Sequence, residues 1–520
     1  MNVNWIVEST AKQIPQVEGD RTALSFDGRV RTSYGELNEH TLRYALALHE
    51  LGLRKGDRLG LLMFNDAEYP LLMLAAARLG VVTVRLNFRL TAPEISFILS
   101  DSGTSVLLVH SSLLHRLEKV RSETSVGTYV VVPDSDDEVP SWAHPFGAML
   151  NRAPFAEAHL PLIEAADPMT LIYTSGTTGS PKGAIWSHAN EMGTASAQAL
   201  RWSFSKDTVA LVPGPLYHAG GFEAVFLPAL LMHGKAVHLA SGNFSVERFL
   251  KVLHEEQVTD CLLFPFILTE LLHHENLEDL LPMSLRRFIL GGDTLMPSTA
   301  QEVKRRLPHV KLAQVYGLTE GGAIATTLED EDFLNQPNSV GRPVPMGEAR
   351  VVRRDGTPAD VGEAGEIEVR NAGVSAGYWN RPDASAATFH DGWCRTGDLG
   401  YVNEDGFLNL GGRAKDMIRS GAENIYPAEI EKVLSAHPSV MLAAVVGVPD
   451  KRFTEVGCAV IVPEAGASID TDDLRAYCRE QLAGYKVPKY FLFADDLPRN
   501  ASGKVLKYVL RETYAQIQDQ

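Results

Sequence analysis

The stretch from Tyr173 to Gly183 gathers the residue types that bind a phosphate. It reads Tyr-Thr-Ser-Gly-Thr-Thr-Gly-Ser-Pro-Lys-Gly and directly follows the apolar pair Leu171-Ile172. This order predicts a short buried strand that ends in a loop whose backbone N–H groups, hydroxyl side chains and lysine can converge on an anion. A glycine-rich turn without a ligand is the alternative. Two adjacent threonines and a lysine in the same loop favour the phosphate site.

The loop does not fit the two commonest nucleotide-binding patterns. In the Gly-x-x-x-x-Gly-Lys-Ser/Thr loop a second glycine precedes the lysine, but here Pro181 holds that place and Gly183 follows Lys182. The Gly-x-Gly-x-x-Gly dinucleotide pattern is also missing from this stretch. We therefore expect a phosphate cradle of another kind.

Two further glycine-bearing turns directly follow predicted strands. Gly291-Gly292-Asp293 follows the strand 287–290, and a turn that starts at Tyr316 follows the strand 311–315. Loops at the carboxyl ends of strands are where α/β sheets bind their ligands. We expect the three loops to come from neighbouring strands and to form one site.

The elements around these loops alternate between helix and strand patterns. Ser33 and Glu36 predict a capping box at the start of a helix. Up to about residue 165, and again over 166–340, short apolar strands alternate with segments of helical periodicity, which predicts parallel sheets with helices on their faces. Residues 341–412 have shorter strands between turns, typical of a small β-barrel, and residues 417–520 predict a separate small α+β domain.

Composition limits the possible classes of function. The 520 residues carry a formal net charge of −17, which argues against a nucleic-acid-binding protein because such proteins present a basic face. The four cysteines lie far apart without a Cys-x-x-Cys pair, which argues against a disulfide scaffold or a structural zinc site. Neither a signal-peptide pattern nor an apolar stretch of about 20 residues is evident, so we expect a cytoplasmic protein without a transmembrane segment.

Five motifs resemble, in order and spacing, the signature motifs of the adenylate-forming superfamily, and they span most of the chain. They are the Tyr173–Gly183 stretch, Tyr316-Gly-Leu-Thr-Glu320, Arg395-Thr-Gly-Asp398, Gly412-Arg-Ala-Lys-Asp416 and Pro498-Arg-Asn-Ala-Ser-Gly-Lys504. Residues 91–103 and 485–511 are most similar to bacterial fatty-acyl-CoA synthetases, in the acyl-CoA synthetase branch.

The resemblance implies a division of the chain. A large N-terminal domain would cover residues 1–412, with two βα-layered subdomains at about 1–165 and 166–340 and a small β-barrel at 341–412. Residues 413–416 would form a hinge at Lys415, and residues 417–520 a small mobile α+β domain.

The resemblance also implies a reaction in which a carboxylate attacks the α-phosphate of ATP to give an acyl-adenylate and pyrophosphate, after which a thiol displaces AMP. Two anions meet in the first step, so the site must offset their repulsion with cations and dipoles. ATP and CoA are the implied co-substrates, and Mg²⁺ is the implied metal, bound at Glu320 and Thr174 because magnesium prefers hard oxygen ligands. The residues implied to bind ATP are Thr174, Ser175, Gly176, Thr177, Thr178, Gly179, Lys182, Gly291, Gly292, Gln314, Tyr316, Gly317, Thr319, Asp398 and Arg413.

Two more implied roles belong to the end of the chain. Lys504 resembles the catalytic lysine that bridges the substrate carboxylate and the α-phosphate, a role suited to a compact charge on a flexible stem. Ser420 and Gly421 resemble the loop that binds CoA and closes the thiol tunnel, although Ala422 stands where many CoA ligases have a second glycine.

The acid itself is suggested by the stretch around His218. Amino-acid-activating relatives have an aspartate at this position, so an α-amino acid is not expected, and His218 would line the junction of the acyl and thiol channels as a catalytic residue. A histidine satisfied in the core is the alternative. Nearby apolar residues predict either an acyl pocket or core packing, and they are Phe222, Phe226, Leu227, Phe264, Phe266 and Ile267.

From these features we predict a medium- or long-chain fatty acid as the substrate. An aryl or cyclic carboxylate, or the loading of a carrier protein in place of CoA, is the alternative. The partners are expected to be small molecules and not nucleic acid. Peripheral membrane contact and the oligomeric state, monomer or homodimer, stay open.

Overall fold

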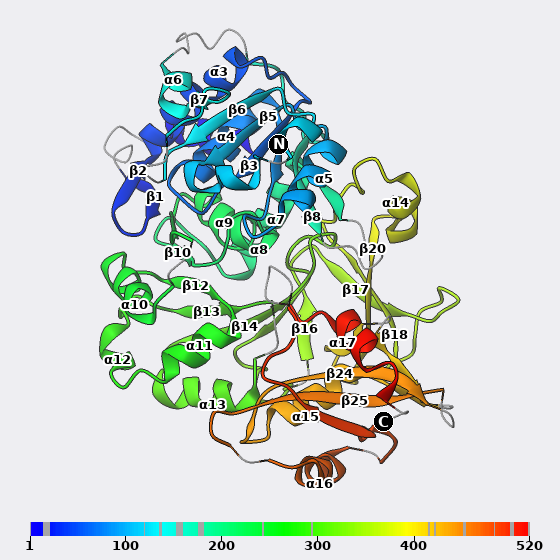
Figure 1. Ribbon diagram of the computed structural model, residues 1–520. Coiled ribbons are helices and arrows are strands. Elements are labelled where there is room, and N and C mark those ends of the chain that lie inside the picture. The colour runs from blue at the N-terminus through cyan, green and yellow to red at the C-terminus, as the bar shows by residue number, and fades with distance from the viewer. Residues whose placement is uncertain are drawn as a thin grey trace. The chain divides into compact units, whose positions relative to one another are not determined.

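The computed structural model describes residues 2–13, 21–118, 120–134, 138–151, 160–174, 181–241, 244–292, 295–337, 339–413, 416–420, 423–450, 454–467, 469–482, 484–499 and 504–517. Its internal contacts divide the chain into two compact units. The first consists of Met1–Ala349 and Val369–Arg395, and the second of Arg350–Glu368 and Thr396–Gln520. Both contain helices and strands (Figure 1), which confirms the predicted α/β class.

The first unit contains a sheet with the strand order β7-β6-β5-β3-β4-β8-β9. The strands from β7 to β8 are parallel, and β9 is antiparallel to β8. β4 and β5 are buried over their whole length, as expected of parallel strands covered on both faces. The strands are β3 (Arg58–Leu62), β4 (Val82–Arg85), β5 (Val106–His110), β6 (Thr128–Val132), β7 (His144–Pro145), β8 (Pro168–Thr174) and β9 (Lys182–Ser187).

The helices of this part begin and end where the sequence supplies caps. α3 (Tyr34–Glu50) starts at the predicted capping box, in which the side chains of Ser33 and Glu36 each accept the other residue's backbone N–H. α4 (Glu68–Leu79) and α5 (Ala92–Ser102) end at Gly80 and Gly103, whose φ angles of 70° and 63° suit glycine. The unit also contains α1 (Asn4–Gln13), η1 (Ser111–Arg116), η2 (Arg121–Glu123), α6 (Phe146–Leu150) and α7 (His188–Arg201).

A second sheet in the same unit has the order β16-β15-β14-β13-β12-β10-β11-β1-β2. It is parallel from β14 to β1, whereas β2, β15 and β16 are antiparallel to their neighbours. The strands are β1 (Thr22–Phe26), β2 (Val30–Ser33), β10 (Val209–Val212), β11 (Lys235–His238), β12 (Asp260–Leu263), β13 (Arg287–Leu290), β14 (Lys311–Tyr316), β15 (Thr326–Glu329) and β16 (Ser339–Pro343). The accompanying helices are α8 (Ala219–Phe222), α9 (Phe226–Leu231), α10 (Val246–Glu255), α11 (Pro265–Leu272), α12 (Leu277–Leu280) and α13 (Pro297–Arg306).

The two sheets do not follow the order of the chain. The prediction that the three glycine-bearing loops leave neighbouring strands was wrong, because β8 lies in the first sheet while β13 and β14 are neighbours in the second. The hairpin β1-β2, which the sequence patterns did not predict, joins the second sheet beside β11. Local periodicity predicts a strand but carries no information about its partner, which explains why β8 was expected beside β13 and β14.

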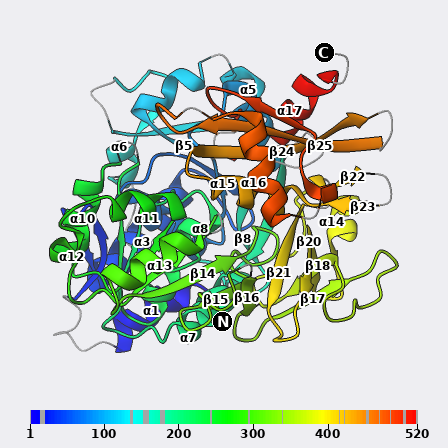
Figure 2. The same ribbon diagram turned by 90° about the horizontal axis from the view of Figure 1, so that it is seen from below.

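The second unit contains a sheet with the order β23-β22-β25-β24, and β26 pairs with β25. Apolar side chains of α15 (Pro427–Ser435) and α16 (Thr471–Gln481) pack on one face of it, and those of α17 (Lys507–Tyr514) pack on the other. Figure 2 shows α15 and α16 on one side of β24 and β25 and α17 on the opposite side. The remaining elements here are β22 (Ile418–Ser420), β23 (Glu423–Ile425), β24 (Val440–Asp450), β25 (Thr454–Pro463), η5 (Gly484–Lys486) and β26 (Tyr490–Phe493).

Short strands follow residue 341, as predicted. β20 and β21 are antiparallel, with Asp398 opposite Arg413. The elements are β17 (Glu348–Val352), β18 (Gly365–Arg370), α14 (Pro382–Thr388), β19 (Phe389–His390), β20 (Trp393–Val402) and β21 (Leu408–Arg413). Ala414 and Lys415 of the predicted hinge lie outside the described residues, so the hinge and the domain ranges stay predictions. Of the helices in the described ranges, none has both the length and the apolar character to cross a membrane.

Candidate active site

Glu320 lies in the turn that follows β14, and two hydroxyl groups hold its carboxylate. Thr174, the last residue of β8, donates a hydrogen bond from Oγ1 to Glu320 Oε1 at 3.0 Å. The phenol of Tyr378 donates a second hydrogen bond to the same oxygen, also at 3.0 Å. Both of these bonds go to Oε1, and neither uses Oε2. Two predicted site residues from different sheets therefore meet at one carboxylate.

The turn around Glu320 is fixed by close packing. A Cβ atom on Gly317 would lie 2.1 Å from the carbonyl oxygen of Ala323, so only glycine fits at this position. Trp186 of β9 is fully buried and donates its indole N–H to the carbonyl oxygen of Thr319 at 3.0 Å. The turn thus presents Thr319 and Glu320 beside the β8-β9 hairpin.

Tyr378 connects Glu320 with Lys182. Its backbone forms a bridge with Ala184 of β9, and its N–H is donated to Ser385 Oγ at 2.8 Å. Lys182 Nζ lies 5.2 Å from the centre of the Tyr378 ring, where a cation is attracted by the ring quadrupole. Burial and then the charge of Glu320 raise the pKa of Tyr378, so its hydroxyl group keeps its proton at neutral pH.

Tyr173 anchors the start of the predicted phosphate loop. Its hydroxyl group donates to Asp101 Oδ2 at 2.7 Å, and Asp101 also pairs with Arg381. Burial and then the bond to Asp101 raise the pKa of Tyr173. A Cβ atom on Gly183 would lie 2.9 Å from the Tyr173 ring, so glycine lets the two strands of the hairpin approach. These contacts secure the described residues on both sides of the loop.

The residues predicted to lie beside the nucleotide base follow or belong to β13 and β14. A Cβ atom on Gly292 would lie 2.8 Å from the ring of Phe264, so this backbone has room for glycine alone. Gln314 is buried, and its Oε1 accepts the backbone N–H of Leu295 at 3.1 Å. Gly291 directly follows β13, and Tyr316 ends the neighbouring strand β14.

His218 caps the short helix α8, where its Nδ1 accepts the N–H of Gly220 at 3.4 Å. The residue is exposed, unlike a histidine satisfied in the core. Desolvation by the surrounding protein, followed by the charge of Arg85, lowers the pKa of His218. Arg85 itself pairs with Glu223 at 2.6 Å, and both side chains are fully buried. The imidazole is therefore expected to be neutral at neutral pH.

The apolar residues predicted near His218 divide into two groups. Phe222, Phe226 and Leu227 are fully buried in the core and Ile267 is also buried, so packing accounts for these four. Phe264 and Phe266 are 38% and 64% exposed, and their stacked rings lie 5.8 Å apart. Of the six side chains only these two are exposed, and their contact with an acyl chain stays a prediction.

Four predicted site residues of the second unit lie within the described residues, and they are Asp398, Arg413, Ser420 and Lys504. Asp398 is buried in β20 and donates its N–H to Thr396 Oγ1 at 3.0 Å, with Arg413 opposite it on β21. Ser420 ends β22, and Lys504 is exposed. Seven predicted site residues lie outside the described residues, and they are Ser175, Gly176, Thr177, Thr178, Gly179, Lys415 and Gly421. The roles of all these residues stay predictions.

The groups at Glu320 fit a magnesium ion that is bound mainly through a nucleotide. Mg²⁺ typically takes one or two carboxylates together with phosphate oxygens and water. Among the described residues no cluster of three or more His, Cys, Asp or Glu side chains could hold a metal by itself. The chain would therefore supply Glu320 as the anionic ligand, with Thr174 beside it, and the phosphates would supply the rest.

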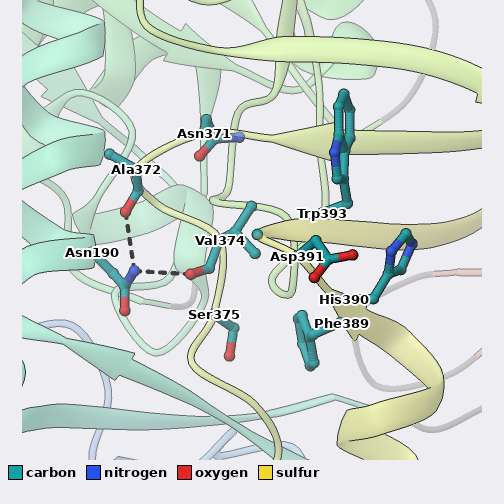
Figure 3. Close-up of a pocket in the computed structure, with 10 residues that line it drawn as sticks. Asn190, Asn371, Ala372, Val374, Ser375, Phe389, His390, Asp391 and Trp393 are labelled. Atoms are coloured by element: carbon teal, nitrogen blue, oxygen red, sulfur yellow. Dashed lines mark hydrogen bonds between the residues drawn. The ribbon is translucent and has the colours of Figure 1, made fainter.

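A cavity of about 320 Å³ is lined by residues that include Asn371 and Ser375, two hydrogen-bond partners of the Glu320 turn. Figure 3 shows Asn190 in it, with its amide group directed at the backbone oxygens to which it donates at 3.0 and 2.8 Å. The side-chain amide of Asn371 donates to the carbonyl oxygen of Gly321 at 2.9 Å. The backbone N–H of Ser375 donates to the carbonyl oxygen of Glu320, also at 2.9 Å. The polar groups of the cavity thus support the turn, and none of the predicted site residues lines it.

Sequence reasoning missed Tyr378. None of the five motifs includes it, and its partner Glu320 lies 58 positions away. The neighbouring Gly377 and Asn380-Arg381-Pro382 indicate a turn but no chemistry. Only the folded chain connects this tyrosine to the site.

Comparison with protein-family models gives two matches. Residues 11–379 match the model described as AMP-binding enzyme, and residues 429–504 match the AMP-binding enzyme C-terminal domain. The first match contains the β8-β9 hairpin and the Glu320 turn, and the second match ends at Lys504.

Two characterised relatives and one solved structure align with nearly the whole chain. The long-chain-fatty-acid–CoA ligase FadD13 of Mycobacterium tuberculosis is 35% identical over 99% of each chain. A feruloyl-CoA synthase of Amycolatopsis sp. is 37% identical over 95% of this chain and 96% of the relative. The structure of o-succinylbenzoate CoA synthetase from Bacillus subtilis, in complex with its acyl-adenylate intermediate, superimposes with a TM-score of 0.85 at 32% identity over 97% of each chain.

Proposed function

The chain belongs to the AMP-binding enzyme family, in the acyl-CoA synthetase branch of the adenylate-forming superfamily, and from this premise we propose that it activates a medium- or long-chain fatty acid. It is an AMP-forming acid–thiol ligase. Such an enzyme converts a carboxylic acid and ATP into an acyl-adenylate and then transfers the acyl group to CoA.

The arrangement at Glu320 is the observation that carries the ATP-dependent step. A carboxylate oriented by Thr174 and Tyr378, with Lys182 close by, combines an anionic metal ligand with a cation for phosphate oxygens. Bound magnesium would supply charge neutralisation of the triphosphate. Fixed charges and donors of this kind lower the cost of bringing a carboxylate to a phosphate.

Further roles follow for the remaining predicted residues. Thr319 would contact the α-phosphate, Gln314 and Tyr316 the base, and Asp398 the ribose hydroxyls. Lys504 would bridge the substrate carboxylate and the α-phosphate in the first step. Ser420 would belong to the CoA site of the second step.

The surroundings of His218 support an apolar acid with one carboxylate. The lowered pKa of His218 keeps this side chain neutral, and Arg85 is already paired with Glu223, so neither offers a free positive charge to a second carboxylate. The partly exposed rings of Phe264 and Phe266 offer an apolar surface to the remainder of the acid. The likeness to the fatty-acid ligase of Mycobacterium tuberculosis is in line with an alkyl chain.

An aryl or cyclic carboxylate is the second candidate. The same aromatic pair would stack on an aryl ring, since aromatic pairs favour offset or edge contacts. The slightly higher identity to the feruloyl-CoA synthase supports this alternative.

A panel of acids tests the proposal. Octanoate, palmitate, benzoate, ferulate and malonate are each incubated with ATP, magnesium and CoA, and pyrophosphate release and product mass are recorded. We expect acyl-CoA and AMP from the alkyl acids at the highest kcat/KM. A higher kcat/KM for benzoate or ferulate would show that the substrate is an aryl acid and not a fatty acid. Product formed only on a phosphopantetheinyl carrier protein would show that the acceptor is that protein and not CoA.

A further inference from the structure

Tyr378 contacts two groups of opposite charge at once. Its hydroxyl group donates to Glu320 Oε1 at 3.0 Å, and the face of its ring receives Lys182 Nζ at 5.2 Å from the ring centre. In the part of the chain that the structure describes, no ion pair joins Lys182 directly to Glu320. The phenol thus stands between an ammonium and a carboxylate that both belong to the candidate site.

We propose that Tyr378 is a positioning residue that keeps Glu320 and Lys182 apart and oriented for a magnesium-bound triphosphate. This inference rests on the proposed function in one respect, namely that Glu320 serves the metal and Lys182 the phosphates. It adds a residue that lies outside all five sequence motifs.

The physical reason is the cost of a direct ion pair. If Lys182 and Glu320 met each other in this partly buried site, ATP and magnesium would have to break that pair before using either charge, and removing one partner of a desolvated pair is costly. A hydroxyl hydrogen bond and a cation–π contact are weaker and leave a lone-pair site on the carboxylate and N–H donors on the ammonium. The tyrosine therefore holds both charges without neutralising them.

The geometry also fixes the carboxylate in advance. Glu320 Oε1 accepts from Thr174 and Tyr378 together, which orients Oε2. Partners that orient a metal ligand in this way typically contribute about 10-fold to 100-fold in metal affinity.

Tyr378 is itself held firmly enough to act in this way. Its backbone bridges Ala184 and donates to Ser385, and the next residue, Trp379, donates its N–H to the carbonyl oxygen of Gly183 at 2.8 Å. Its ring packs against Phe389 with centres 5.4 Å apart. Packing and backbone hydrogen bonds of this kind fix the orientation of a side chain, as a precise binding site requires.

Two substitutions separate the two contacts, and binding measured without turnover reports on them. Tyr378→Phe keeps the ring and removes the hydroxyl group, whereas Tyr378→Leu removes both. Calorimetric titration of ATP, with no acid present, is repeated over a series of magnesium concentrations. For Tyr378→Phe we expect the magnesium concentration at half-maximal ATP binding to rise about tenfold, with near-normal ATP affinity at saturating magnesium. For Tyr378→Leu we expect ATP affinity to fall at saturating magnesium as well.

Controls distinguish positioning from a general loss of structure. Tyr129→Phe removes another buried phenol hydroxyl, which bonds Thr124 Oγ1 at 3.0 Å, and it should leave the magnesium dependence unchanged. In a Glu320→Gln background, Tyr378→Phe should add little, because its effect acts through that carboxylate.

The outcomes separate this inference from the proposed substrate. If the wild-type protein binds Mg·ATP but forms no acyl-CoA from any fatty acid, the proposed substrate is wrong. That result would not contradict the role of Tyr378. A Tyr378→Phe protein with wild-type magnesium dependence overturns the role of Tyr378, as does wild-type ATP binding that is independent of magnesium, whatever acid the enzyme uses.

Discussion

Thr174 Oγ1 and Glu320 Oε1 lie 3.0 Å apart, although Thr174 ends β8 of the first sheet and Glu320 follows β14 of the second. The hydroxyl group is the donor, since an ionised carboxylate can only accept. The bond therefore ties the predicted phosphate loop, which begins directly after Thr174, to the carboxylate predicted to bind magnesium.

Removing this hydroxyl group should weaken the use of Mg·ATP. Thr174→Val keeps the shape of the side chain but leaves Glu320 with one donor, and a hydrogen bond to a charged group is worth about 1.5–3 kcal/mol when buried. We expect the KM for ATP to rise about tenfold in a pyrophosphate-release assay. Thr174→Ser retains the hydroxyl group and is the matched control. A valine variant with the serine variant's KM would show that the bond is unimportant.

Lys504 should be needed in the first half-reaction alone. We expect Lys504→Ala to lower the rate of acyl-adenylate formation by about 100-fold or more, the usual size of a lost charge-stabilising contact. Transfer to CoA from supplied acyl-adenylate should stay near the wild-type rate. Both steps are followed separately by pyrophosphate release and by thioester mass. Lys489→Ala removes an exposed lysine of the same unit and serves as the control.

An equal loss of both steps in Lys504→Ala would contradict a role confined to adenylation. A loss in Lys489→Ala of the same size would indicate that positive charge on the surface of this unit, and not Lys504 itself, is what matters.

Sequence reasoning worked best where the determinant is local. The capping box of Ser33 and Glu36 is present as predicted, and the strand Arg287–Leu290 has the predicted bounds. Each depends on a few adjacent residues and on the period of apolar side chains. The nucleotide motifs were found for the same reason, because each lies within one loop.

The relations that the sequence did not reveal are all between distant residues. Membership of β8 in one sheet and of β14 in the other depends on strand partners, which no local pattern encodes. The contacts of Tyr378 with Glu320 and of Tyr173 with Asp101 join segments 58 and 72 positions apart. Such pairs form only when the sheets have formed. The residues that hold the predicted site residues in place could therefore not be predicted from the sequence.

A methyl group at Gly317 should disrupt the Glu320 turn. The added Cβ would lie 2.1 Å from the carbonyl oxygen of Ala323, a contact with backbone that no side-chain rotation relieves. We expect Gly317→Ala to destabilise the protein by about 1–3 kcal/mol, as overpacking does, and to raise the KM for ATP. Urea unfolding and steady-state kinetics measure the two effects.

Gly147→Ala is the matched control for this substitution. It lies in α6, and its Cβ would meet nothing within 4 Å. Alanine favours helix over glycine by about 0.5–1 kcal/mol, so this variant should be as stable as the wild type or more so. If Gly317→Ala also behaved in this way, the close approach to Ala323 would not be a constraint on the turn.

Glu191 should make the stability of the protein fall as the pH rises. It is fully buried on α7 beside Glu223, whose partner is Arg85. Burial, and then the charge of Glu223, raise the pKa of Glu191 well above the ordinary value of 4.5. Above pH 4.5 the unfolded chain therefore releases a proton that the folded chain keeps, and this difference costs about 1.4 kcal/mol of stability for each pH unit until the folded pKa is reached.

Glu191→Gln removes this titration while keeping the shape of the side chain. Relative to wild type, we expect the unfolding free energy of the variant to increase from pH 5 to pH 7, because only the wild type loses stability through this group. Urea unfolding at pH 5, 6 and 7 measures it. Glu404→Gln changes an exposed glutamate, and its difference from wild type should stay constant over this range. Parallel pH profiles for Glu191→Gln and wild type would mean that Glu191 ionises normally in the folded protein, with Arg85 shared between both glutamates.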